Sequence, residues 1–316
     1  HYFTCESADF HHDLDRMVEH DDRHVFIVHG PREHAKSTRA RVGLIKQVLR
    51  GQWRYPLLVS EELKLSKQHL NYIAAELTAN RRIQADYEVD VIRHSHNEGT
   101  LQLRITPAAT GVAHHVLIEA ESYKTSVKGK LFMQHRPDAA LIDDFEDTES
   151  SRNVEIARRK VTWVLQELYP AIAGGPIVWL GNTARDTSAL YQGMLEAVGD
   201  ETLLRRYMER GTPTGGNIPI SLDRLTEKLR NGSETGVQGD ASTSPTPDAD
   251  SESHSPDDDA IEADLSVYIY RATTGTEEGI VYLWPERYDK VWYERMRATM
   301  GDARFESEMN GNPQSR

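Results

Sequence analysis

The sequence predicts an α/β fold with a mainly parallel central sheet and helices on both faces. Three observations support this. Short apolar runs alternate with segments of helical periodicity, small or turn-forming residues separate them, and polar residues follow several of the apolar runs. Alternating strands and helices build parallel sheets. Ligands bind such sheets at the carboxyl ends of the strands.

Six apolar runs are predicted strands: residues 24–29, 55–60, 101–106, 115–120, 139–142 and 176–180. Apolar residues at helical spacing predict helices over residues 37–50, 65–80 and 151–168, the first of which ends at Gly51. Near the end of the chain we expect 267–271 and 280–284 to pair as strands. A helix is predicted over 289–300, and a loop over 308–316.

The acidic charge is concentrated in one segment. The 316 residues carry a net charge of −13, and residues 231–264 contribute ten acidic side chains and no Lys or Arg. The rest of the chain therefore sums to −3, which is compatible with a DNA-binding face. Because residues 231–264 are rich in Ser, Pro, Gly and Asp, they have little apolar surface to bury. We expect a folded core over 1–230, a disordered acidic insertion over 231–264 and a further structured segment over 265–316.

Composition excludes several classes of protein. Cys5 is the only cysteine, so an internal disulfide and a multi-cysteine zinc site are excluded. No apolar run approaches the ~20 residues that span a bilayer, and we expect no membrane association. The first ten residues lack the basic and apolar regions of a signal peptide.

A phosphate-binding loop follows the first predicted strand and opens the first predicted helix. Its residues are Gly30, Pro31, Arg32, Glu33, His34, Ala35, Lys36, Ser37 and Thr38. Backbone N–H groups at such a loop cradle phosphate oxygens. Lys36 is expected to reach the β- and γ-phosphates of ATP, and the Ser37 hydroxyl to bind Mg²⁺.

Two residues of the loop are unusual. Ala35 replaces the second glycine of the consensus, and because Ala disfavours positive φ we expect a slightly altered cradle. Arg32 is either a solvated loop residue or a second cation close to the γ-phosphate.

A second motif ends the predicted strand 139–142. Asp143, Asp144 and Glu146 follow this strand, which is the arrangement of a Walker B motif. We assign Asp143 to Mg²⁺ and Asp144 to orienting or deprotonating the attacking water, with Glu146 as the competing base. Such a run of acids on its own is equally typical of a solvated loop.

A third strand end carries Gly181, Asn182 and Thr183. These small polar residues stand where a sensor of the γ-phosphate is expected. An ordinary strand–turn–helix junction has the same pattern.

Together these motifs resemble the ATPase portion of the large subunit of the tailed-virus terminase, a bacteriophage-type motor that packages DNA. The resemblance extends over nearly the whole chain. It rests on residues 10–14, 31–38, 57–60, 136–144, 181–183, 283–287, 301–305 and 310–313. The resemblance implies a P-loop NTPase fold of the RecA/ASCE-like kind. It implies a P-loop ATPase core over 1–230 and, over 265–316, the end of the ATPase region and a linker toward a missing nuclease domain.

The resemblance also implies activity, cofactors and partners. We expect ATP hydrolysis with Mg²⁺ that translocates double-stranded DNA into a procapsid, in a homo-oligomeric ring that meets the portal and the small terminase subunit in the host cell cytoplasm. The family carries a nuclease after this region. Only residues 314–316 follow Pro313, so nuclease activity is not expected here.

Motors of this kind are commonly completed by an arginine from a neighbouring subunit. Arg136, just before the Walker B strand, is the candidate, and Lys128 and Arg152 are alternatives.

Three other functions share parts of this pattern. Another P-loop translocase or helicase would unwind strands, and a P-loop phosphotransferase would need an acceptor pocket and a lid. A binding module with a degenerate site would bind nucleotide without turnover.

Overall fold

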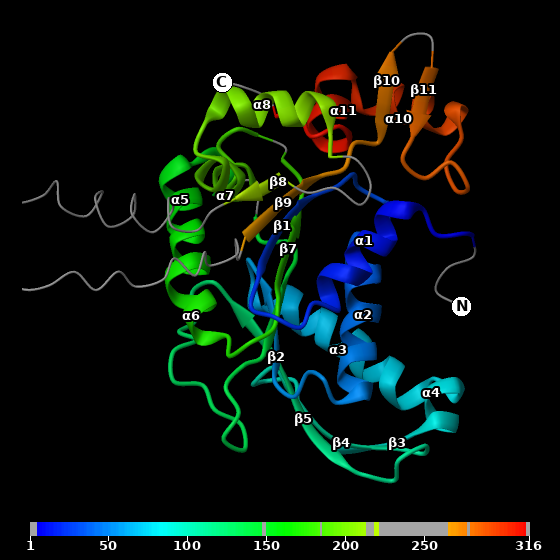
Figure 1. Cartoon of the computed structure of the whole chain (residues 1–316), viewed down its shortest axis with the longest axis vertical. Helices are drawn as coiled ribbons and strands as arrows, with labels where there is room; N and C mark the ends of the chain where they lie inside the picture. Colours follow the sequence, from blue (N-terminus) through cyan, green and yellow to red (C-terminus); the bar gives the residue numbers. More distant parts are fainter. Residues whose placement is uncertain are drawn as a thin grey trace, which may run out of the picture.

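The computed structural model describes residues 5–146, 150–183, 185–212, 218–220, 265–276 and 279–313. A nine-stranded sheet runs through the molecule (Figure 1). In spatial order its strands are β3 Tyr87–Ser95, β4 Thr100–Pro107, β5 His114–Ser122, β2 Pro56–Ser60, β6 Ala139–Ile142, β7 Ile177–Gly181, β1 Val25–His29, β9 Leu265–Ile269 and β8 Ile218–Ile220.

Six neighbouring strands of this sheet, from β5 to β9, are parallel. At one edge β4 and β3 run antiparallel to their neighbours, and at the other edge β8 does. The predicted mainly parallel sheet is therefore confirmed. β7 lies between β1 and β6, which places an additional strand between the phosphate-loop strand and the acidic strand, as the name of the ASCE class denotes.

Helices cover both faces of the sheet, because successive side chains of each strand point to opposite faces. In β1, Phe26 and Val28 belong to one hydrophobic core, and Val25 and Ile27 belong to the other. The first core includes α1 Asp9–Val18, α2 Lys36–Arg50 and α3 Leu63–Ala79. The second includes α5 Val154–Trp163, α7 Ala189–Val198 and α8 Glu201–Arg210.

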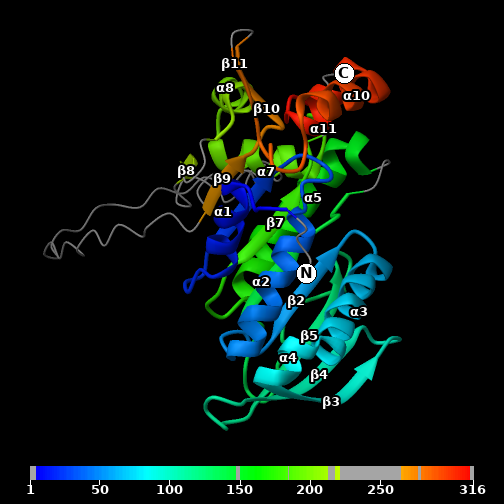
Figure 2. The same ribbon diagram turned by 90° about the vertical axis from the view of Figure 1, so that its right-hand side faces the viewer.

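The remaining elements include those at the two ends of the molecule. Figures 1 and 2 show the helices α10 and α11 and the β10–β11 hairpin at one end, opposite β3 and β4. Their bounds are α4 Arg81–Asp86, η1 Ser150–Arg152, α6 Tyr169–Ala171, β10 Thr273–Thr276, β11 Gly279–Tyr282, α10 Lys290–Met300 and α11 Asp302–Met309.

The long helix predicted over 151–168 is displaced and irregular, since helical structure runs without a break from Val154 to the end of α6 at Ala171. It begins at Val154, because the Asn153 side chain accepts hydrogen bonds from the N–H groups of Glu155 and Ile156. The segment Val164–Leu168 continues it as a π-helix (η2).

Two predictions near the end of the chain are wrong. Residues 267–271 and 280–284 do not pair: β9 lies beside β1 in the central sheet, and β11 pairs with β10. β9 joins the sheet because Leu265, Val267 and Ile269 fill the core under α7. The predicted loop over 308–316 starts inside α11, whose Phe305 and Met309 are buried.

The predicted acidic insertion, 231–264, lies outside the described residues, and the predicted domain boundaries around it stay predictions. Among the helices that the structure describes, none combines the length and the apolar character that crossing a membrane requires.

In the turn before β7, replacement of two adjacent glycines by alanine is expected to affect stability very differently. A Cβ on Gly175 would lie 2.2 Å from the Asp138 carbonyl oxygen, whereas a Cβ on Gly174 meets nothing within 4 Å. We expect Gly175→Ala to lower the free energy of unfolding by about 1–3 kcal/mol through overpacking. Gly174→Ala, the matched control, should stay within about 0.5 kcal/mol of the parent protein. Urea titrations of both variants measure this, and equal stabilities would contradict the packing described here.

Candidate nucleotide-binding site

Three predicted motifs lie together at the carboxyl ends of the central strands. The loop 30–38 follows β1, Asp143 and Asp144 follow β6, and Asn182 and Thr183 follow β7. Because these three strands are parallel neighbours, their carboxyl ends lie together. The Gly30 N–H donates to the Gly181 carbonyl oxygen, 3.2 Å away, which joins the first motif to the third.

The Lys36 ammonium lies inside the loop. Its Nζ donates to the carbonyl oxygens of Gly30, at 2.6 Å, and Pro31, at 2.7 Å. Burial lowers the pKa of Lys36 to about 8, while Asp143 and Asp144 act in the opposite direction. The aliphatic part of the Lys36 side chain packs over Gly30. A Cβ at that position would lie only 2.6 Å from Lys36 Cδ, so glycine is the residue that leaves room for this side chain. A phosphate beside this nitrogen would favour its charged form.

The loop backbone is left-handed at Glu33, with φ 63°, and at Ala35, with φ 58°. Ala35 thus adopts the conformation that its side chain disfavours, at a cost of roughly 1–2 kcal/mol. It directly precedes α2. The first N–H groups of an α-helix have no partner within the helix, and they attract anions.

Hydrogen bonds from outside the loop hold its carbonyl groups. His11 Nδ1 accepts from the Ala8 N–H, so its Nε2–H donates to the His34 carbonyl oxygen, 3.0 Å away. The Tyr288 hydroxyl donates to the Glu33 carbonyl oxygen at 2.9 Å. The loop is therefore fixed by residues of α1 and of the segment before α10.

The His34 side chain points away from the expected phosphate position. Its Nδ1 donates to the Arg32 carbonyl oxygen at 2.7 Å, and its Nε2 accepts from the Tyr293 hydroxyl at 2.9 Å. Burial lowers its pKa to about 3, so the ring is neutral. Of the residues predicted to bind nucleotide, His34 can contribute only its backbone.

Arg32 is neither fully solvated nor free of a partner. Its Nε lies 3.0 Å from Glu308 Oε2, and Arg304 donates to the other oxygen of the same carboxylate at 2.8 Å. Glu308 is buried on α11. The structure thus connects the loop arginine to the last helix that it describes.

The two acids after β6 differ in environment. Asp143 is 6% exposed; its Oδ1 accepts from the Asp144 N–H at 3.1 Å, and its Oδ2 has no hydrogen-bond partner among the described residues. Burial, and secondly the Asp144 charge, raise the pKa of Asp143, while the Ser37 hydroxyl acts to lower it. Asp144 has φ 49° and an exposed side chain.

Glu146 is engaged elsewhere. Its Oε1 accepts from the Leu190 N–H at 3.0 Å, in the first turn of α7. Burial raises the pKa of Glu146 to about 7, against the effects of this hydrogen bond and of Lys160. Lys160 is buried; it donates to the Phe145 carbonyl oxygen at 2.8 Å and forms an ion pair with Glu61.

Asn182 and Thr183 tie the loop to the end of the chain. Asn182 Nδ2 donates to the carbonyl oxygens of Gly30, at 3.0 Å, and Glu308, at 2.9 Å. The Thr183 hydroxyl donates to the Gly311 carbonyl oxygen at 3.2 Å. Gly181, Asn182 and Thr183 therefore contact both the loop and the region around α11.

A cavity of about 360 Å³ lies beside the loop. It has charges of both signs, contributed by Arg32, Asp144, Glu146, Arg185, Arg304 and Glu308. Asp144 and Arg32 thus line the same cavity.

Arg136 is not part of this site. It is exposed and precedes β6, so it lies at the amino end of this strand, whereas Asp143 lies at the carboxyl end. It follows a tight turn in which Met133, with φ 47°, and Gln134, with φ 72°, are left-handed. Lys128 lies 3.9 Å from Glu167, and Arg152 ends η1.

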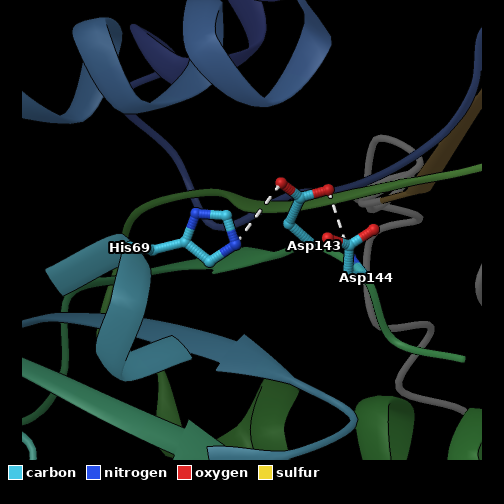
Figure 3. Close-up of side chains that lie close together, drawn as sticks. All are labelled: His69, Asp143 and Asp144. Atoms are coloured by element: carbon cyan, nitrogen blue, oxygen red, sulfur yellow. Dashed lines mark hydrogen bonds and ion pairs between the residues drawn. The ribbon is translucent and has the colours of Figure 1, made fainter. Parts of the chain in front are cut away.

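Sequence analysis missed one residue of the site, His69. It comes from α3, and its Nε2 lies 3.9 Å from Asp143 Oδ2 (Figure 3). Donor atoms of His69, Asp143 and Asp144 all lie within 4.8 Å of one another. Nothing in the local sequence singles out this histidine, because only the fold brings α3 to the end of β6.

The residues predicted to hold Mg²⁺ fit that ion. Asp143 offers a buried carboxylate oxygen without a hydrogen-bond partner among the described residues. The Ser37 hydroxyl is near enough to this carboxylate to lower its pKa. A hydroxyl and a carboxylate are ligands that Mg²⁺ prefers, alongside phosphate oxygens and water.

The strand order and the loop define a P-loop NTPase of the ASCE class. The structure is similar to the large terminase ATPase domain of Thermus phage P74-26, with a TM-score of 0.46, 11% identity, and 90% of this chain and 86% of that chain covered. It is also similar to a large terminase of a thermophilic bacteriophage in complex with ADP, with a TM-score of 0.39, 10% identity and coverage of 65% and 50%.

A third solved structure, the Phi-28 gp11 DNA packaging motor, has a TM-score of 0.34 and 10% identity over 87% of this chain and 81% of that chain. No protein-family model and no curated protein sequence matches the chain. Likeness at this distance does not carry an activity from one protein to another. The functional argument therefore rests on the site itself.

The left-handed Ala35 gives a prediction about stability. Ala35→Gly should relieve the backbone strain and raise the free energy of unfolding by about 0.5–1 kcal/mol, after the greater entropy of unfolded Gly is subtracted. The control, Ala75→Gly in the exposed face of α3, should lower it by about 1 kcal/mol. Urea titration measures both. Destabilisation of equal size at both positions would mean that Ala35 is not left-handed.

Proposed function

We propose that the chain is an ATP-hydrolysing motor subunit that moves viral DNA into a procapsid, the ATPase portion of a terminase large subunit. One observation supports the hydrolysis: a buried lysine, a buried carboxylate and an exposed carboxylate lie close together after β1 and β6. These are the groups that phosphoryl transfer to water requires. The DNA-packaging role is supported by the resemblance of the sequence motifs to the terminase family.

In this proposal the phosphates of ATP lie in the loop 30–38. Lys36 Nζ exchanges its contacts with the Gly30 and Pro31 carbonyl oxygens for phosphate oxygens. Ser37 and Asp143 would hold Mg²⁺, which when bound offsets the negative charge on the phosphates. Asp144 orients the attacking water and accepts its proton.

Two further residues assist in this proposal. Arg32, released from Glu308, adds a second cation beside the γ-phosphate. Asn182 senses the γ-phosphate through its contact with Gly30.

The proposed assembly is a homo-oligomeric ring around double-stranded DNA in the host cytoplasm, joined to the portal and the small terminase subunit. Arg136 is the proposed arginine supplied to a neighbour. Two features support this assignment. Arg136 is exposed, and it lies at the amino ends of the parallel strands, away from the site at their carboxyl ends. Lys128 and Arg152 are the alternatives.

Lys36→Ala should abolish ATP hydrolysis without unfolding the protein, because it removes the side chain that reaches the phosphates. Lys46→Ala is the matched control, since Lys46 is a half-exposed lysine on the same helix, paired with Glu19. A coupled assay of phosphate release, with circular dichroism to verify folding, measures both variants. Turnover at the parent rate in Lys36→Ala would remove the phosphate-loop assignment.

The two acids should fail in different ways. Asp144→Asn is expected to bind Mg²⁺ and ATP but to hydrolyse ATP at least ~10²-fold more slowly. Asp143→Asn should instead weaken Mg²⁺-dependent binding. Nucleotide titrations and single-turnover rates separate binding from chemistry. If Glu146→Gln lost the rate and Asp144→Asn kept it, the catalytic role would belong to Glu146.

Translocation itself is tested by displacement of a triplex-forming oligonucleotide from linear double-stranded DNA, with ATP and the assembled subunits. Displacement without strand separation supports a packaging motor. Strand separation would indicate a helicase, and phosphate transfer to an acceptor other than water would indicate a phosphotransferase.

A further inference from the structure

His69 lies at the proposed metal site, but no role has yet been given to it. Its side chain is 16% exposed and faces Asp143, whose side chain is 8% exposed. The facing oxygen, Asp143 Oδ2, is buried without a hydrogen-bond partner among the described residues. Such an oxygen is costly to bury unless a cation or a donor meets it. The geometry admits two roles for His69: a ligand of the metal, or a donor that positions Asp143.

Arg41 decides between these roles. Its Nη1 donates to His69 Nδ1, 3.4 Å away. A guanidinium has only donors, so Nδ1 must present its lone pair. The proton of the neutral ring is then on Nε2, the nitrogen that faces Asp143 (Figure 3). A metal ion on Nε2 would place a second N–H, on Nδ1, against the N–H of Arg41.

The guanidinium of Arg41 is itself held in place. Its Nε donates to the Ser37 carbonyl oxygen at 3.2 Å, and its Nη2 donates to the Thr38 hydroxyl at 3.4 Å. It also lies over the Tyr72 ring, 5.2 Å from the centroid. The first turn of α2, which carries Ser37, therefore fixes the orientation of His69.

We propose that His69 is a positioning residue for the metal-binding carboxylate. Its Nε2–H, oriented by Arg41, holds the Asp143 carboxylate in the position from which Asp143, together with Ser37, would bind a divalent cation. The separation of 3.9 Å exceeds a direct hydrogen bond, and one water or a small side-chain rotation closes it. A chain of contacts thus runs from α2 through α3 to the end of β6.

The proposal rests on the metal role of Asp143 in the proposed function, and its first test is independent of nucleotide. Two-bond ¹H–¹⁵N correlation spectra of protein labelled at histidine report the tautomer of each neutral ring, and the His69→Gln variant assigns the signal. We expect the proton on Nε2. A proton on Nδ1 would overturn the proposal.

The second test uses three variants. His69→Leu should raise the Mg²⁺ concentration for half-maximal hydrolysis by about 10-fold or more, the usual effect of outer-shell partners, and leave kcat at saturating Mg²⁺ within about 3-fold. His69→Gln keeps an N–H donor at the same reach and should stay within about 3-fold of the parent protein. Gln68→Leu, an exposed neighbour, is the control. An unchanged Mg²⁺ requirement in His69→Leu would refute the role.

Mn²⁺ titrations followed by electron paramagnetic resonance repeat the comparison on protein without nucleotide, so failure of ATP turnover leaves the role of His69 testable. We expect weaker Mn²⁺ binding in His69→Leu and recovery in His69→Gln. Spin-echo modulation from an imidazole nitrogen in the parent protein, lost in His69→Gln, would make His69 a ligand and overturn the positioning role.

Discussion

The site depends on the burial of one ammonium group in a loop of backbone. Lys36 is 8% exposed, and two carbonyl oxygens of its own loop hold its Nζ. A buried cation is costly unless polar groups surround it. To bring two carbonyl groups to one nitrogen, the loop must curl tightly around Lys36. The left-handed backbone at Glu33 and Ala35 produces this curl, and Gly30 leaves room for the Lys36 side chain.

The curled loop in turn needs support from distant parts of the chain. His11 on α1, Tyr288, Tyr293 on α10 and Glu308 on α11 all contact it. Residues between Tyr288 and Glu308 are therefore part of the site's framework. The loop thus contacts α10 through His34 and α11 through the ion pair of Arg32 with Glu308.

The sequence predicted well what local periodicity and motif chemistry determine. β1, α2 and β6 were expected close to their observed positions, and the predicted motifs at 30–38, 143–144 and 181–183 lie together at one edge of the sheet. It could not predict partners far apart along the chain. The Tyr293 contact of His34 spans 259 residues, and His69 reaches Asp143 only because α3 packs beside β5 and β2. β9 was misassigned for the same reason, since its neighbour in the sheet is β1.

The most direct test of this account is a crystal structure with Mg²⁺, ADP and a phosphate analogue. The account predicts phosphate oxygens against the N–H groups of residues 30–38, with Lys36 Nζ turned from the Gly30 and Pro31 carbonyl oxygens to the analogue. It also predicts the cation between Ser37 and Asp143, and Asp144 facing the attacking water. Nucleotide bound elsewhere, with Lys36 still on its two carbonyl oxygens, would contradict it.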